Sequence, residues 1–383
     1  MEDLPKDPKT AELPMHQECS MKALVKILCV FGLTVFCGAC GGGSGGGGTT
    51  TAATVPPAPP AIPDPVSDAN YTVFQLDVLP GHSRAQANDI NDNGQIVGFS
   101  AAPLQTAVLW TVDATGAITL QSLGMLIGGT FSIAYGINNL GQVVGFADGA
   151  SGTRRPFIWT ANDGMRDLGV PVGLVGGWAY RINDAGQVVG IFTPSQTDTS
   201  FESTFGIWIV DESGATTEER NLGNLGGKNA IAFDNNVHGN VAGDIFFELT
   251  GSGTNQTGFF WSEAGGVIEI GTEEALGIND FDEVVGVLST SGDDGYVWTA
   301  AGGLTEILGG VASAINNSGQ VTGRPNAGGP AWIWENGERK LLPMHENRDF
   351  GWGLSINEAG WIVGWSTDVG GNEYANLWIP VQP

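Results

Sequence analysis

One short pattern returns seven times in residues 70–383, and this repetition constrains the fold more than any other feature of the chain. Its first copy reads INDNGQIVGFS, and later copies follow at intervals of 47, 45, 53, 43, 37 and 41 residues. A small residue stands three positions before each copy, and an apolar residue followed by tryptophan comes after it. Repeats of this length are typical of propellers and solenoids. The copies begin at Ile90, Ile137, Ile182, Asn235, Ile278, Ile315 and Ile356.

Each unit is predicted to contain four short strands. The first ends at Ile-Asn, the second is the QVVG segment, the third ends in tryptophan and the fourth ends in Leu-Gly. Consecutive residues of the second and third strands are apolar although they must point to opposite faces, so both faces are expected to be buried. Four-stranded blades packed around an axis meet this requirement. The sequence therefore predicts an all-β fold, a seven-bladed β-propeller.

The two ends of the repeat region complement each other. The last unit stops directly after its third strand, whereas residues 71–81 form a strand of the fourth type that belongs to no unit. If this N-terminal strand completes the last blade, the ring closes without an unpaired edge, which would otherwise invite aggregation. We therefore expect residues 70–383 to form one propeller of four-stranded blades closed by the N-terminal strand.

The segment before the repeats resembles an export signal. Residues 1–20 carry five acids and two lysines, which does not suit a signal leader, so we expect them to be an extra leader before a true start at Met21. Residues 21–39 then read as a signal peptide, with two lysines ahead of an apolar run from Ile27 to Phe36. That run is shorter than the roughly 20 apolar residues that a membrane-spanning helix needs.

The signal ends in Gly-Ala-Cys, which resembles the lipobox of bacterial lipoproteins. This predicts lipidation of Cys40, although Cys37 stands where the motif usually has leucine, and an ordinary signal peptide cut nearby is the alternative. No cysteine follows Cys40, so the domain holds no disulfide. Residues 40–69 pass from Gly/Ser-rich to Pro-rich and are expected to form a tether. The predicted location is the cell envelope, as an outer-membrane lipoprotein facing the periplasm or exterior, or otherwise secretion.

The repeated units, such as AYGINNLGQVVGFA with RRPFIWTANDGMRDLG after it, resemble the HAF-repeat family of bacterial extracellular proteins. The resemblance covers nearly all of residues 70–383 and rests on the IN-x-x-GQVVG element. The His-Ala-Phe that names the family is not retained, since the matching positions read AVLW, PFIW or GIW. The resemblance implies an exported bacterial repeat protein, and it brings no catalytic residues with it.

Charge and loop length bear on the partner. The chain has a formal net charge of −26, which argues against nucleic acid and anionic lipid headgroups because both are bound through basic patches. Membrane contact is expected through the lipid anchor only. The loops between second and third strands vary most, and the longest are residues 193–204 and 246–257. We expect a monomer that contacts an unidentified protein or glycan with this loop face, although these loops also read as tolerated insertions.

Catalytic and metal-binding motifs are weak, so the sequence predicts that the chain is not an enzyme and needs no cofactor. Residues 70–383 contain neither H-E-x-x-H nor G-x-S-x-G. The best catalytic set is Asp89, Arg181 and Asp234, which precede the repeated turn and would line the central channel, with solvated rim charges as the alternative. The domain's histidines stand in differently written loops: His82, His238 and His345.

Two further features of the sequence bear on ligand binding. Four tryptophans outside the repeat position could stack on sugar rings. They are therefore compatible with a carbohydrate-binding, lectin-like propeller or with a carbohydrate-active one, a polysaccharide lyase or hydrolase. Packing in the core explains them as well. The first turn also matches the start of a calcium loop, D-x-N-x-N-G. Other copies lose its oxygens, so we predict a turn without metal, with asparagine as its cap and glycine at positive φ. These residues are Trp178, Trp352, Trp361, Trp365, Asp89, Asn91, Asn93 and Gly94.

Overall fold

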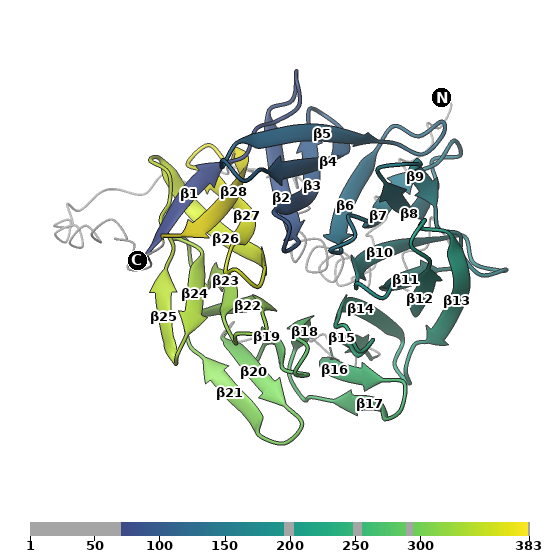
Figure 1. The fold of residues 1–383 in the computed structure, drawn as a ribbon. Helices are drawn as coiled ribbons and strands as arrows, with labels where there is room; N and C mark the ends of the chain where they lie inside the picture. The colour runs from purple at the N-terminus through teal and green to yellow at the C-terminus, as the bar shows by residue number, and fades with distance from the viewer. Residues whose placement is uncertain (1–69, 195–202, 248–254, 289–293, 382–383) are drawn as a thin grey trace, which may run out of the picture. The chain divides into compact units, whose positions relative to one another are not determined.

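The computed structural model describes residues 70–194, 203–247, 255–288 and 294–381. These residues form β-strands joined by turns and loops, and the strands make seven four-stranded antiparallel sheets arranged in a ring (Figure 1). The predicted all-β, seven-bladed propeller is thereby confirmed. Among the described residues there is no helix of the length and hydrophobicity that crossing a membrane requires.

The first three blades follow the chain from the inner to the outer strand. Blade 1 comprises β2 (Arg84–Ile90), β3 (Gln95–Ala101), β4 (Gln105–Val112) and β5 (Ile118–Gly124). Blade 2 comprises β6 (Ser132–Ile137), β7 (Val143–Asp148), β8 (Arg154–Thr160) and β9 (Gly164–Asp167). Blade 3 comprises β10 (Gly176–Ile182), β11 (Gln187–Thr193), β12 (Thr204–Val210) and β13 (Thr216–Gly223).

The next three blades repeat this order. Blade 4 comprises β14 (Asn229–Asn235), β15 (Val241–Phe246), β16 (Gln256–Ser262) and β17 (Gly266–Glu269). Blade 5 comprises β18 (Glu274–Ile278), β19 (Val284–Val287), β20 (Gly295–Thr299) and β21 (Gly303–Ile307). Blade 6 comprises β22 (Gly310–Ile315), β23 (Val321–Pro325), β24 (Trp332–Glu335) and β25 (Glu338–Leu341).

Blade 7 combines strands from both ends of the chain. Its inner strands are β26 (Arg348–Ile356), β27 (Ile362–Asp368) and β28 (Glu373–Pro380), and its outer strand is β1 (Tyr71–Gln75). β1 pairs antiparallel with β28 along its whole length, and Figure 1 shows the two side by side. The Tyr71 hydroxyl also donates a hydrogen bond to the Gly360 carbonyl at 3.0 Å.

The hydrophobic core lies between blades, where apolar residues of neighbouring sheets face each other. One cluster joins Val189 and Ile207 of blade 3 to Val241 and Phe259 of blade 4, and all four side chains are fully buried. The repeated tryptophan anchors such clusters. Trp208 is fully buried, and its indole N–H donates to the Gly169 carbonyl at 3.0 Å. Apolar pairs in the sequence are therefore buried on both sides, as the pattern predicts.

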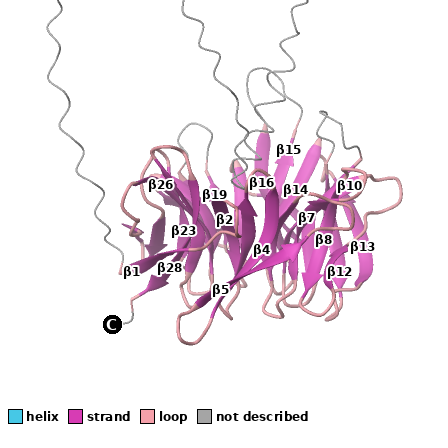
Figure 2. Cartoon of the chain, turned by 90° about the horizontal axis from the view of Figure 1, so that it is seen from above, coloured by secondary structure: helices cyan, strands magenta, loops and turns pink. Residues whose placement is uncertain are grey.

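The connections divide between two faces, which Figure 2 shows edge-on. Turns between first and second strands lie on one side, called the turn face. Loops between second and third strands, and loops between blades, lie on the other, called the loop face, because antiparallel strands reverse direction at each connection. Most of the two long loops singled out from the sequence, namely residues 195–202 and 248–254, lie outside the described residues.

Candidate functional site

The repeated asparagine links the blades at the turn face. The Asn91 amide donates to the Asn138 carbonyl at 2.9 Å, and every later copy contacts the next blade in the same way until Asn357 donates back to the Asn91 carbonyl at 3.1 Å. Each side chain is buried, so these hydrogen bonds satisfy groups that water does not reach. The seven donors are Asn91, Asn138, Asn183, Asn236, Asn279, Asn316 and Asn357.

The same asparagine caps its own turn. The Asn91 side-chain oxygen accepts the backbone N–H groups of Asn93 and Gln95 at 3.1 and 3.0 Å. Gly94 has φ of +72°, and its N–H donates to the Asn91 carbonyl. The predicted turn is therefore confirmed. Asp89 accepts hydrogen bonds from the Ile137 N–H and the Ser355 hydroxyl instead, so its carboxylate does not join the Asn91 and Asn93 oxygens in a calcium loop.

A second polar ring surrounds the mouth of the channel on this face. The side chain that follows each repeated asparagine accepts a backbone N–H of the preceding blade. For example, Asp92 of blade 1 accepts the Glu358 N–H of blade 7 at 3.0 Å. Val237 of blade 4 holds the equivalent position and has no side-chain oxygen to accept such a bond. They surround a cavity of about 180 Å³. Burial, with Asp92 and Asp280 nearby, raises the pKa of Glu358. Within the described residues, no group of three His, Cys, Asp or Glu side chains is placed to hold a metal ion.

The three residues of the predicted catalytic set lie on the innermost strands of blades 1, 3 and 4. Arg181 Nε lies 3.7 Å from Asp234 Oδ1, and Arg181 donates to the Tyr135 carbonyl at 2.6 Å. Asp234 accepts the Ile278 N–H at 3.0 Å, as Asp89 accepts the Ile137 N–H at 2.9 Å. Each aspartate therefore binds an amide of the following blade, which makes these two side chains inter-blade contacts rather than solvated rim charges.

The surroundings of Asp234 raise the pKa of its carboxyl group. Burial raises its pKa to about 6, and the charge of Asp89 acts in the same direction, while Arg181 and the amide hydrogen bonds oppose the shift. One fifth of the Asp234 side chain is exposed, and the effect of burial on its pKa still exceeds the opposing effect of Arg181. A carboxyl with a pKa near 6 is suited to exchange protons near neutral pH.

The structure keeps the other sequence candidates apart. The His82 ring contacts the Ser100 hydroxyl at 3.0 Å on the loop face, His238 lies in the turn of blade 4, and His345 lies in the loop before blade 7. Burial lowers the pKa of His345, and the nearby charge of Arg348 adds to this. The three imidazoles therefore stand at different loops and form no common site.

The additional tryptophans serve mainly in packing. Trp352 and Trp365 are buried, their ring centroids are 5.8 Å apart, and Arg324 covers Trp352 at 4.9 Å. Trp178 is half-buried against Phe146, with ring centroids 5.1 Å apart. The remaining one, Trp361, packs at the turn face against the core between blades 7 and 1. These rings are not gathered into one sugar-binding surface.

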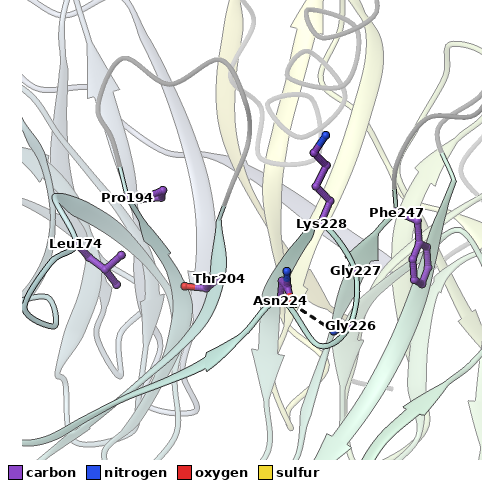
Figure 3. A pocket seen from close by; sticks show the side chains of 8 residues that line it. All are labelled: Leu174, Pro194, Thr204, Asn224, Gly226, Gly227, Lys228 and Phe247. Atoms are coloured by element: carbon purple, nitrogen blue, oxygen red, sulfur yellow. Dashed lines mark hydrogen bonds between the residues drawn. The ribbon is translucent and has the colours of Figure 1, made fainter.

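Sequence reasoning missed a cavity of about 590 Å³ on the loop face between blades 3 and 4. Figure 3 shows its lining, with Asn224 and Thr204 in the middle, Leu174 and Pro194 on one side and Phe247 on the other. Its volume falls in the range of about 300–1,000 Å³ that is typical of ligand sites. The complete lining is Leu174, Pro194, Thr204, Asn224, Gly226, Gly227, Lys228 and Phe247.

The predicted lipidation site, Cys40, lies outside the described residues, as do the proposed signal (21–39) and tether (40–69). These assignments therefore stay predictions. The same holds for the resemblance to HAF-repeat proteins, because none of the protein-family models matches the sequence, and none of the curated proteins matches it either.

Solved structures similar to this chain include two that are named as enzymes. An acylaminoacyl peptidase from Pyrococcus horikoshii aligns with a TM-score of 0.51 at 12% identity, over 77% of this chain and 51% of the peptidase. A puromycin hydrolase aligns with a TM-score of 0.52 at 15% identity, over 81% of this chain and 55% of the hydrolase. The β-propeller domain of Cps50 (Swd1) from Myceliophteria thermophila aligns at 0.48 and 12% identity, over 82% of this chain and 99% of that domain.

These comparisons correct the prediction that the chain is not an enzyme. The chain spans about half the length of the peptidase and the hydrolase, and their chains contain a fold like this one. A propeller of this shape is therefore compatible with catalysis, and the weakness of the sequence motifs is no argument against it. At identities of 12–15%, the similarity establishes the fold and leaves the activity to be argued from the residues themselves.

Proposed function

We propose that this protein is a binding module that is exported, held at the bacterial cell envelope by a lipid on Cys40, and in contact with its partner through the loop face. The observation that carries the binding surface is the coincidence of the variable loops with the ligand-sized cavity between blades 3 and 4. Loops on a rigid scaffold are where binding residues usually gather. The β-propeller fold supplies that scaffold.

Exposed apolar side chains support the same face. The three most exposed aliphatic residues of the described chain are Val172, Ile127 and Val369, at 107%, 96% and 88%. All three lie in loop-face connections, the first two between blades and Val369 between β27 and β28. Covering apolar side chains at loop tips with a partner removes them from water and so makes the free energy of binding more favourable.

We expect a double substitution of Ile127→Asp and Val172→Asp to weaken binding to the cell envelope by about tenfold or more, because buried apolar contacts would be replaced by desolvated charges. Co-sedimentation with isolated envelope material measures this, with all variants made in a Cys40→Ala background that lacks the proposed lipid anchor. The matched control is Leu140→Asp with Phe281→Asp, since these residues are 58% and 70% exposed on the turn face. Equal loss in both double variants would contradict the assignment of the loop face.

Anchoring by lipid is tested separately. Cys40→Ala is expected to move most of the protein from the membrane fraction to the soluble fraction and to abolish incorporation of labelled palmitate, because the acylated thiol is lost. Cys29→Ala removes a cysteine from the apolar run and should leave both readouts unchanged. Retention of the Cys40→Ala variant in the membrane fraction would show that another element holds the chain there.

A further inference from the structure

We infer that two copies of this chain associate through the outer edge of blade 1, with β5 of one copy antiparallel to β5 of the other. The proposed function concerns the loop face, whereas this contact lies on the rim of the ring (Figure 1). A two-fold symmetric dimer then takes the place of the monomer expected from the sequence. β5 combines an unpaired strand edge with a segment that carries no charge.

The outer side of β5 has backbone groups available for pairing. β5 is the last strand of its sheet and, among the described residues, pairs only with β4. The Asp113 N–H donates to the Ala117 carbonyl, so odd-numbered residues of β5 bond to β4 and even-numbered residues face outward in the alternating ladder. An open edge of this kind is a template for another strand. The outward-facing residues are Ile118, Leu120 and Ser122.

Charge is almost absent from this part of the chain. Residues 93–147 contain a single charged side chain, Asp113, in a chain with 41 acidic residues and a formal net charge of −26. Asp113 precedes β5, so the two copies of Asp113 lie at opposite ends of the paired strands. Two copies of so acidic a chain repel each other over most of their surface. Self-association is therefore least opposed at blade 1.

The other outer strands are less suited to pairing. β9, β13, β17, β21 and β25 each carry at least one charged side chain. Charged side chains on an edge strand hinder its pairing with another chain. β1 is uncharged, but it has only five residues, and Arg348 donates a hydrogen bond to its Gln75 side chain at 3.0 Å. β5 is thus the longest outer strand without a charge beside it.

The regular part of β5 is symmetric about Leu120. A bulge at Leu123 interrupts the ladder with β4, so the regular part ends at Ser122. When Leu120 lies opposite Leu120 of the second copy, Ile118 lies opposite Ser122 of that copy, and all outward-facing residues form hydrogen-bonded pairs. This pairing occupies both edges, so association stops at two copies and does not continue into a fibre.

The strength of the contact follows from its size. Two paired edges of this length bury less than the roughly 1,200 Å² of a stable interface, so the dimer is expected to be weak in dilute solution. Copies held on one membrane meet at a higher effective concentration, which favours the dimer. Only this increase depends on the proposed lipid on Cys40.

Disulfide trapping tests the register. Thr119→Cys and Gln121→Cys are made separately in the full chain with its four native cysteines replaced by alanine, and are mixed in detergent solution under oxidising conditions. We expect about tenfold more cross-linked dimer from the mixture than from either variant alone. Positions 119 and 121 of the two copies are directly opposite, whereas identical positions are diagonal neighbours about 7–8 Å apart, too far for a disulfide. Equal yields from the mixture and the separate variants would overturn the inference.

Charge substitution tests the same contact without a covalent bond. Thr119→Lys with Gln121→Lys places like charges opposite each other and should weaken self-association by about tenfold or more in sedimentation equilibrium. Thr119→Glu with Gln121→Glu should do the same, and mixing the lysine and glutamate variants should restore the dimer. The matched control is Thr305→Lys, at an exposed position of the outer strand β21, which should associate as the native chain does.

Three results of this experiment overturn the inference. They are a native chain that stays monomeric up to about 1 mM, a lysine variant that associates as strongly as the native chain, and a mixture that associates no more than its components. None of them affects the envelope assay with Ile127→Asp and Val172→Asp, which tests the proposed function independently.

Discussion

Replacing Gly190 by alanine is expected to lower the free energy of unfolding by about 3 kcal/mol or more. Gly190 is the glycine of the QVVG strand and pairs with Ala179 of the innermost strand. A Cβ at this position would lie far inside 3.0 Å of the Trp178 carbonyl oxygen, a separation that real Cβ atoms do not show. Because the obstacle is backbone of the same blade, no change of side-chain rotamer relieves it.

Chemical denaturation followed by tryptophan fluorescence measures this loss. Gly149→Ala is the matched control, because Gly149 is in the connection between β7 and β8 and the nearest atom to its added Cβ, the Thr153 carbonyl oxygen, is 4.0 Å away. Its effect should stay within about 0.5 kcal/mol. If both variants were equally stable, the two inner strands of the blade would have to move apart at little cost in free energy, which would contradict this prediction. The obstacle recurs in every blade, at Gly98, Gly145, Gly190, Gly243, Gly286, Gly323 and Gly364.

The strand count and the number of blades could be predicted from the sequence. Repetition, paired apolar residues and a small residue before each turn were sufficient for the strand count and the seven blades. The asparagine was predicted as a turn cap, but its hydrogen bond to the next blade was not, because its partner lies at least 37 residues away in the sequence. One signal was available: asparagine persists even in the degenerate copy at Asn236, whereas a turn cap alone also tolerates aspartate or serine.

The candidate site was predictable only in part. Asp89, Arg181 and Asp234 stand at equivalent positions of three repeats, so the sequence predicted that they lie around one axis, and the structure brings Arg181 Nε within 3.7 Å of Asp234 Oδ1. Repetition could not show that the two carboxylates bind amides of the following blade. The cavity between blades 3 and 4 was not predictable, because its lining comes from separate loops that differ between units. The sequences of loops that share no repeated pattern do not indicate which of these loops lie close together in the fold.

The second large effect concerns Asp234. We expect Asp234→Asn to gain stability relative to the native chain as the pH rises, by about 2.5 kcal/mol between pH 4 and pH 8. Burial raises the pKa of the carboxyl to about 6 in the folded state, against an ordinary value of 3.8. The folded protein therefore binds a proton more tightly than the unfolded chain does. This contribution to stability is complete below pH 3.8 and is lost as the pH rises through 6.

Asparagine remains neutral throughout this pH range, so the stability of the variant does not fall as the pH rises through 6. Denaturation of both proteins at pH 4, 5, 6, 7 and 8 measures the difference, and the two curves should diverge mainly between pH 4 and 6. Carbon NMR of the aspartate carboxyls should show one titration near pH 6 that is absent from Asp234→Asn. Parallel stability curves would mean that Arg181, whose Nε lies 3.7 Å from the carboxylate, fully compensates the burial. In that case the channel would hold a permanent ion pair and could not exchange a proton near neutral pH.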